Sequence, residues 1–262
     1  MTIRWWARIY LFPYLLFVAA VLGAAAMGWA GLKADTVPSL AVGALTKAAF
    51  LSAAAWHAFV ARQIMRSRAW AFIAGGFIGY MIGQWCLVVY QLVLGIPTPF
   101  PSWADPFFVL GTLSLMIGLW IFLHELSLSG CPLDLRRRVP MSSVWILGLG
   151  GWALWTLLRP VLHSGAPTID TWLSLTYPIT DLLLLVPTLL LFQVTGPFRG
   201  GKVRRTWATL LFGIILFLVG DLLFALRHDG VGPWFHWAVD MSFICGYALV
   251  ARACAMQHEM VR

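Results

Sequence analysis

Long runs of apolar residues alternate with short polar segments along the whole chain. Eight of these runs are long enough to cross roughly 30 Å of hydrocarbon as helices. Continuous runs of this kind are typical of membrane helices, whereas the strands of membrane barrels are shorter and alternate apolar with polar residues. The predicted spans cover residues 9–31, 40–61, 69–94, 105–126, 142–163, 171–194, 206–227 and 234–256.

The composition supports this assignment. The chain is 61% hydrophobic and only 11% charged, whereas a soluble domain carries about a quarter charged residues. We therefore expect an all-α integral membrane protein with almost no mass outside the bilayer. A signal peptide is the alternative for the first run, but its apolar stretch is too long, so we expect a retained helix.

The distribution of lysine and arginine predicts the orientation. Although the net charge is +8, the basic residues form short clusters between the spans, so we expect contact with the lipid bilayer and no nucleic-acid partner. Cytoplasmic loops of membrane proteins are enriched in Lys and Arg, which places both termini in the cytoplasm. We expect the membrane to be a bacterial inner membrane. The cytoplasmic side then holds Arg4, Arg8, Arg62, Arg66, Arg68, Arg136, Arg137, Arg138, Arg199, Lys202, Arg204, Arg205, Arg252 and Arg262. The opposite side holds Lys33, Arg159 and Arg227.

Two segments of the chain match each other without a gap. Residues 68–84 (RAWAFIAGGFIGYMIGQ) align with residues 205–221 (RTWATLLFGIILFLVGD), so that Gln84 aligns with Asp221. Each segment is followed by an acidic residue and then by a glycine: Asp105 and Gly111 in the first case, Asp240 and Gly246 in the second. The pattern predicts two parallel four-helix halves, 1–130 and 131–262, within one membrane domain. A chance match between apolar segments is the alternative.

Acidic side chains inside the apolar spans are the strongest functional signal. An aspartate at mid-membrane costs about 2.5–3.5 kcal/mol on insertion scales, so each should face the bundle interior, a water-filled cavity or a partner. When the spans are traced in their predicted directions, the outer half of the membrane contains Asp105, Asp181, Asp221 and Asp240. The same depth contains Lys47, Gln84, Tyr90 and Tyr177. We therefore predict a ligand-binding cavity that is lined by these residues and open toward the periplasm.

Simpler interpretations remain for each of these groups. The aspartates could only bond neighbouring helices, and the lysine could extend outward to the interface. His57 and His124 leave open a heme held by two histidines, and three histidines near the outer surface leave open a metal site: His163, His228 and His236. The sequence has no serine-hydrolase elbow, zinc motif, phosphate loop or dinucleotide fingerprint. We therefore predict no catalytic residue and no metal ligand, and the cofactor is unknown.

Four phrases resemble the polytopic sensor module found at the N-terminus of many bacterial diguanylate cyclases and some histidine kinases. They are IPTPFPSWADPFFVLG (96–111), TYPITDLLLL (176–185), VGDLLFAL (219–226) and WAVDMSFICGYALVARA (237–253). The resemblance covers most of the chain from about 50 to 256 and implies a membrane input domain that passes a signal through its last helix. The residues that it implies are Asp105, Tyr177, Pro178, Asp181, Gly220, Asp221, Asp240 and Gly246.

Two features depart from that module. Related sequences tend to carry an acid where this chain has Gln84, and the module normally feeds a cytoplasmic effector, whereas this sequence ends at Arg262. We therefore expect either a separate cytoplasmic or membrane protein partner, or another use of the module.

The acid pattern is also similar to that of the eight-span lysoplasmalogenase family. This second resemblance implies hydrolysis of a vinyl-ether lipid, with Asp181 and Asp221 as the candidate general acid and base. Our first expectation is nevertheless a ligand-sensing or signalling module that binds a small molecule or a lipid headgroup. The alternatives are a structural or assembly subunit of a larger membrane complex, a transporter or channel, and the hydrolase.

Overall fold

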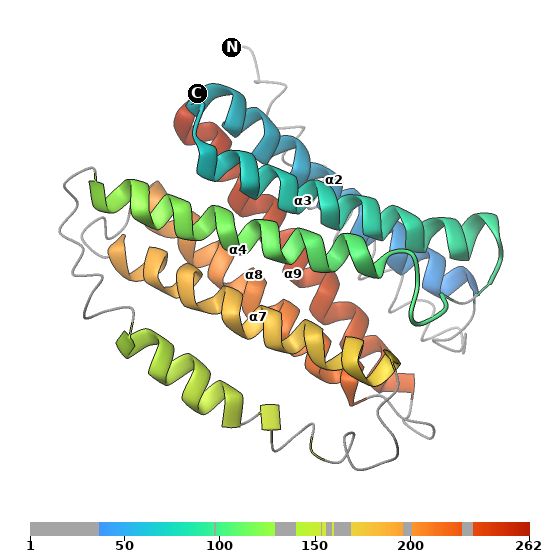
Figure 1. Cartoon of the computed structure of the whole chain (residues 1–262). Helices are drawn as coiled ribbons and strands as arrows, with labels where there is room; N and C mark the ends of the chain where they lie inside the picture. The colour runs from blue at the N-terminus through green and yellow to red at the C-terminus, as the bar shows by residue number, and fades with distance from the viewer. Residues whose placement is uncertain are drawn as a thin grey trace.

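The computed structural model describes residues 37–96, 98–128, 140–152, 154–155, 159, 169–195, 201–226 and 233–262. Within these ranges every regular element is a helix (Figure 1). The α-helices are α2 (Val37–Met65), α3 (Arg68–Val88), α4 (Asp105–Leu128), α7 (Ile169–Val194), α8 (Lys202–Ala225) and α9 (Pro233–Val261), and two π-helical segments are η1 (Val89–Val93) and η2 (Val144–Gly150). Six of the helices are long and apolar enough to cross a membrane. The predicted all-α class is confirmed.

The predicted spans agree with these helices to within a few residues at most ends. Span 142–163 is described in part, and span 9–31 lies outside the described residues. The largest difference is at the end of α9, which continues to Val261 although the apolar run ends near 256. The helix continues because its polar residues are buried against α2: Gln257 contacts Met65, and His258 contacts His57. The total of eight spans and the positions of the termini stay predictions.

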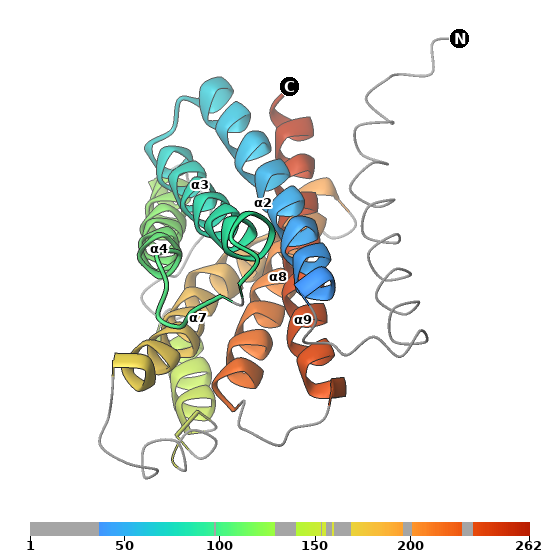
Figure 2. The same ribbon diagram turned by 90° about the vertical axis from the view of Figure 1, so that its right-hand side faces the viewer.

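The six long helices form a closed ring. Each packs against two neighbours, in the order α2, α3, α4, α7, α8, α9 and back to α2. Figures 1 and 2 show this arrangement, with α9 lying beside α2 although the two are far apart in sequence. We call the end of the ring where α2 ends and α8 begins the basic end, because Arg62, Arg66, Arg68, Lys202 and Arg205 lie there.

Large apolar side chains fill the interior of the ring. Phe50, Leu119 and Leu190 are at most 2% exposed. Other large apolar side chains face outward, such as Trp56, which is 63% exposed, and Phe212, which is 60% exposed. An outer surface of this kind suits lipid contact better than contact with water.

Glycines set the closest approach between neighbouring helices at two places. A Cβ atom on Gly76 of α3 would lie 2.9 Å from the carbonyl oxygen of Gly111 on α4, and one on Gly213 of α8 would lie 3.1 Å from that of Gly246 on α9. Small residues allow the backbones of membrane helices to come this close. The ungapped repeat aligns Gly76 with Gly213, and Gly111 and Gly246 each lie six residues after the acid that follows a repeated segment. The α3–α4 and α8–α9 crossings are therefore built alike.

Replacement of Gly213 by alanine tests this crossing. The added methyl group would lie 2.8 Å from Val250 Cγ2, so we expect a loss of about 1–3 kcal/mol of unfolding free energy. Gly151→Ala is the matched control, because nothing lies within 4 Å of its added carbon. Unfolding of both variants in detergent micelles measures the difference, and equal stabilities would contradict the close crossing.

Candidate functional site

Asp105 begins α4 and links it to α7. One carboxylate oxygen accepts hydrogen bonds from the backbone N–H and the hydroxyl of Ser102, the latter at 3.0 Å. The other oxygen accepts a hydrogen bond from the Tyr177 hydroxyl of α7. Three donors therefore satisfy this buried carboxylate, which holds the tyrosine hydroxyl against the start of α4.

Asp181 lies one helical turn after Tyr177 on α7 and is 2% exposed. Its carboxyl group lies close to that of Asp221 on α8. Among the residues that the structure describes, no N–H or O–H group donates to Asp181 Oδ2. Ionised carboxylates can only accept hydrogen bonds, so these two groups could bond each other only if one of them carried a proton.

Three tyrosines lie near Asp221. Asp221 is close enough to act electrostatically on the hydroxyls of Tyr80, Tyr177 and Tyr247. The Tyr80 hydroxyl also lies 2.6 Å from Thr112 Oγ1 on α4. Their neighbours are aromatic, with ring centroids 6.4 Å apart for Tyr80 and Tyr247 and 4.9 Å apart for Phe217 and Tyr247.

These groups form one polar cluster inside an apolar bundle. The acid–tyrosine cluster consists of Tyr80, Asp105, Thr112, Tyr177, Asp181, Asp221 and Tyr247, which come from α3, α4, α7, α8 and α9. It extends from the first residue of α4 to the middle of α7, since Asp181 lies about 18 Å along that helix from its start. A polar track thus runs from one end of the bundle to about half its depth.

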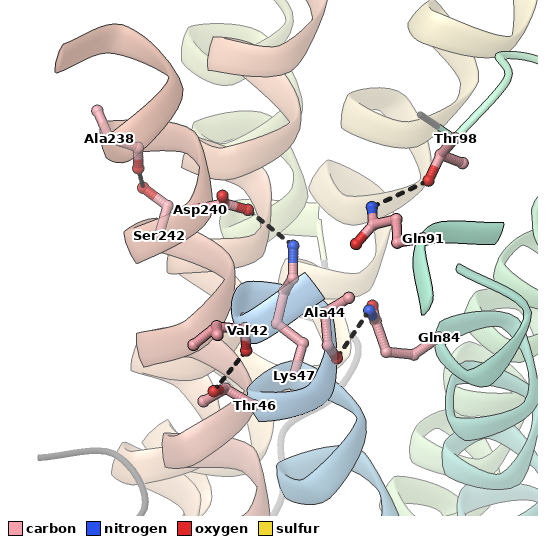
Figure 3. A network of polar contacts seen from close by, with 10 residues as sticks. All are labelled: Val42, Ala44, Thr46, Lys47, Gln84, Gln91, Thr98, Ala238, Asp240 and Ser242. Atoms are coloured by element: carbon pink, nitrogen blue, oxygen red, sulfur yellow. Dashed lines mark hydrogen bonds and ion pairs between the residues drawn. The ribbon is translucent and has the colours of Figure 1, made fainter. Parts of the chain in front are cut away.

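A second polar group joins α2 to α9 and α3. Lys47 Nζ lies 2.7 Å from Asp240 Oδ1, and Gln84 Nε2 donates to the backbone oxygen of Ala44 at 3.2 Å. Figure 3 shows the lysine pointing from α2 toward the aspartate on α9. Lys47 Nζ is also 6.0 Å from the Phe243 ring, which stacks on Tyr247. The aromatic rings thus separate this ion pair from the acid–tyrosine cluster.

Seven of the predicted site residues lie in two groups of side-chain contacts. Asp105, Tyr177, Asp181 and Asp221 belong to the acid–tyrosine cluster, and Lys47, Gln84 and Asp240 to the group on α2. Tyr90 lies on η1, half-buried, and none of the side-chain contacts found at described residues joins it to either group. A polar cavity open toward the periplasm stays a prediction.

Sequence reasoning missed Tyr80, Thr112 and Tyr247. Helical periodicity could have found two of them, because Tyr80 lies four residues before Gln84 and Tyr247 lies seven residues after Asp240, on the same faces. Thr112 gave no signal of its own, since threonine is common in apolar helices.

The heme alternative pairs His57 with His124, but the structure pairs His57 with His258. His57 Nδ1 lies 3.0 Å from His258 Nδ1, and both rings are buried between α2 and α9, whereas His124 is exposed on α4. In the part of the chain that is described, no group of three or more His, Cys, Asp or Glu side chains could hold a metal ion. His163 and His228 lie outside it.

A scan against protein-family models finds no match to this chain, and searches of curated proteins and of solved structures find nothing similar. The two family resemblances of the sequence therefore stay expectations. Function has to be argued from the geometry of the two polar groups.

A double-mutant cycle tests the ion pair between α2 and α9. The side chains of Lys47 and Asp240 are 14% and 28% exposed, so the pair is partly shielded from solvent. We expect Lys47→Met and Asp240→Asn to couple by about 0.5–3 kcal/mol in the free energy of unfolding. Strictly additive effects of the two substitutions would contradict a stabilising contact.

Proposed function

We propose that the protein is a ligand-sensing module of a bacterial inner membrane, with the acid–tyrosine cluster as its ligand site. A small molecule or a lipid headgroup binds there from the periplasmic side, and α9 passes the signal to a cytoplasmic or membrane protein partner. The observation that supports this most is the convergence of five helices on two contacting carboxyl groups.

Helix packing alone does not call for such a pair. Asp105 has three donors and can serve as a structural link. Asp181, by contrast, is buried with one oxygen that no described group donates to. Ionisable groups at this depth in a membrane are costly and are functional by default, so the pair is better explained by a ligand than by stability.

The contacts of α9 suit transmission of a signal. At the site it contributes Tyr247, and toward the same end of the bundle Asp240 bonds Lys47 of α2. At the basic end, His258 of α9 contacts His57 of α2. His258 lies about 16 Å from Tyr247 along α9. A displacement of α9 on ligand binding would therefore change its contacts with α2 at both ends.

The proposal includes eight spans with both termini cytoplasmic and a parallel repeat of halves 1–130 and 131–262. The matching glycine crossings support the repeat. A second correspondence comes from the polar contacts. Ala44 precedes Asp181 by 137 residues, the same offset that separates Gln84 from Asp221. The Gln84–Ala44 contact on α2 is thus the counterpart of the Asp221–Asp181 contact on α7.

The carboxyl pair also favours a second candidate, an intramembrane hydrolase. A general acid and a general base need one protonated and one ionised group at the same centre, and Asp181 and Asp221 are in contact. Turnover of a vinyl-ether lysolipid by the purified protein would favour the hydrolase over the sensor.

Hydrogen exchange of the Asp181→Asn variant tests the proposed signalling. Because the substitution replaces a carboxyl group of the site by an amide and Tyr247 of α9 lies near that group, we expect amide exchange in residues 252–262 to change by about 5-fold or more. Leu182→Ala is the control, because this neighbouring side chain is also buried, at 6% exposure, but is apolar. Two outcomes would contradict a role of α9 in signalling. In the first, Asp181→Asn changes amide exchange in α7 and α8 only; in the second, Asp181→Asn and Leu182→Ala change amide exchange in the same residues by the same amount.

A further inference from the structure

Two histidine rings join α2 to α9, the helices that close the ring of the bundle. The Nδ1 atom of His57 lies 3.0 Å from that of His258, and the ring centroids lie 5.3 Å apart. His57 is 6% exposed and His258 is 8% exposed. A separation of this size is that of a direct hydrogen bond, so one ring nitrogen donates to the other inside the bundle.

A hydrogen bond between two Nδ1 atoms fixes the protons of both rings. The donating Nδ1 carries a proton and the accepting Nδ1 does not, so the accepting ring is neutral and carries its own proton on Nε2. One added proton can bind to Nε2 of the donating ring, which still donates from Nδ1. A second added proton can only bind to the accepting Nδ1, and both nitrogens are then donors. The contact therefore exists only while the pair carries at most one positive charge.

The surroundings of the pair oppose that second proton. Arg262 and Glu259 act electrostatically on His258 from its own helix, and most of the remaining charges at this end of the described helices are basic. The charged and titratable residues there are Arg62, Arg66, Arg68, His124, Glu125, Lys202, Arg204, Arg205, Arg252, Cys254, Glu259 and Arg262. Like charges repel and burial disfavours an unpaired cation, so both rings become charged only in acid.

Loss of this bond would free one end of α9 and leave the other end attached to α2. Beside the histidines, Gln257 contacts Met65 at 3.7 Å, a weak bond without a titratable group. The ion pair of Lys47 with Asp240 lies about 27 Å away along α9. The histidine bond is therefore the strongest side-chain link between α2 and α9 that the structure shows at the basic end.

We propose that the His57–His258 pair is a pH-sensitive switch, which holds the basic end of α9 against α2 until both rings are charged and then releases it. The second proton comes from solvent and binds to the lone pair of the accepting Nδ1, so no covalent bond is broken. This inference goes beyond the proposed function, because the pair responds to protons whether or not the acid–tyrosine cluster binds a ligand.

The first experiment is nitrogen NMR of the full chain in detergent micelles, with histidine labelled by nitrogen-15. At about pH 7.5 we expect a scalar coupling between two Nδ1 nuclei through the hydrogen bond, and at about pH 4.5 we expect its loss. The coupling should be absent from His57→Leu, which assigns it to this pair. His124→Leu is the matched control, because His124 is exposed on α4, and it should keep the coupling.

The second experiment measures amide hydrogen exchange in residues 252–262 at the same two pH values, relative to the intrinsic rate at each pH. Loss of one hydrogen bond is expected to lower the protection in acid by about 2- to 12-fold. His57→Gln should remove this pH dependence, because its amide can donate to a neutral His258 and accept from a charged one. Exchange around Asp240 reports on the ion pair and should not follow the histidines.

Three results would overturn the inference. No coupling at about pH 7.5 would show that the rings are not bonded, and a coupling that persists in acid would show that the second proton does not enter. Loss of the coupling without a change in protection would show that the pair does not hold α9. If His57→Leu does not fold, the double variant His57→Leu/His258→Leu, apolar on both helices, replaces it. The exchange response to Asp181→Asn stays a separate test of the proposed function.

Discussion

The contact between Asp181 and Asp221 is the constraint on which the rest of the structure depends. Two carboxyl groups in an apolar bundle are tolerated only when their charge is balanced and their oxygens find donors. A third acid, Asp105, is satisfied by three donors. What the protein leaves unmet, at Asp181 Oδ2, is the reason to expect a proton or a ligand there.

The α3–α4 and α8–α9 pairs have similar backbone packing but different polar contacts. The α3–α4 and α8–α9 pairs both cross at glycines. In each pair a polar residue extends toward the helix before it in the chain: Gln84 of α3 toward α2, and Asp221 of α8 toward α7. The amide of Gln84 donates a hydrogen bond to the backbone oxygen of Ala44. At the corresponding place in the second pair, the carboxyl group of Asp221 lies close to that of Asp181. Such an asymmetry within a similar frame is what a duplicated scaffold with one ligand site would show.

The sequence alone predicted the helices well, because apolar runs of about twenty residues have few other structures available to them. It also singled out Asp181, Asp221, Asp105 and Tyr177, since polar residues stand out in apolar spans. Depth along a span does not specify which neighbour a helix faces, so the sequence could not say which of these side chains contact each other. The closure of the ring by α2 and α9 joins Lys47 to Asp240, and no local pattern encodes that contact. The His57–His258 contact was missed for the same reason.

We infer that Asp181 and Asp221 share a proton inside the bundle, and this is the central claim. Infrared difference spectroscopy in the carbonyl-stretch region of protonated carboxyl groups tests it most directly. We predict an absorption in the natural chain that disappears in both Asp181→Asn and Asp221→Asn, because a pair that shares one proton loses its common signal when either member is replaced. Spectra in which neither substitution changes this absorption would contradict the account.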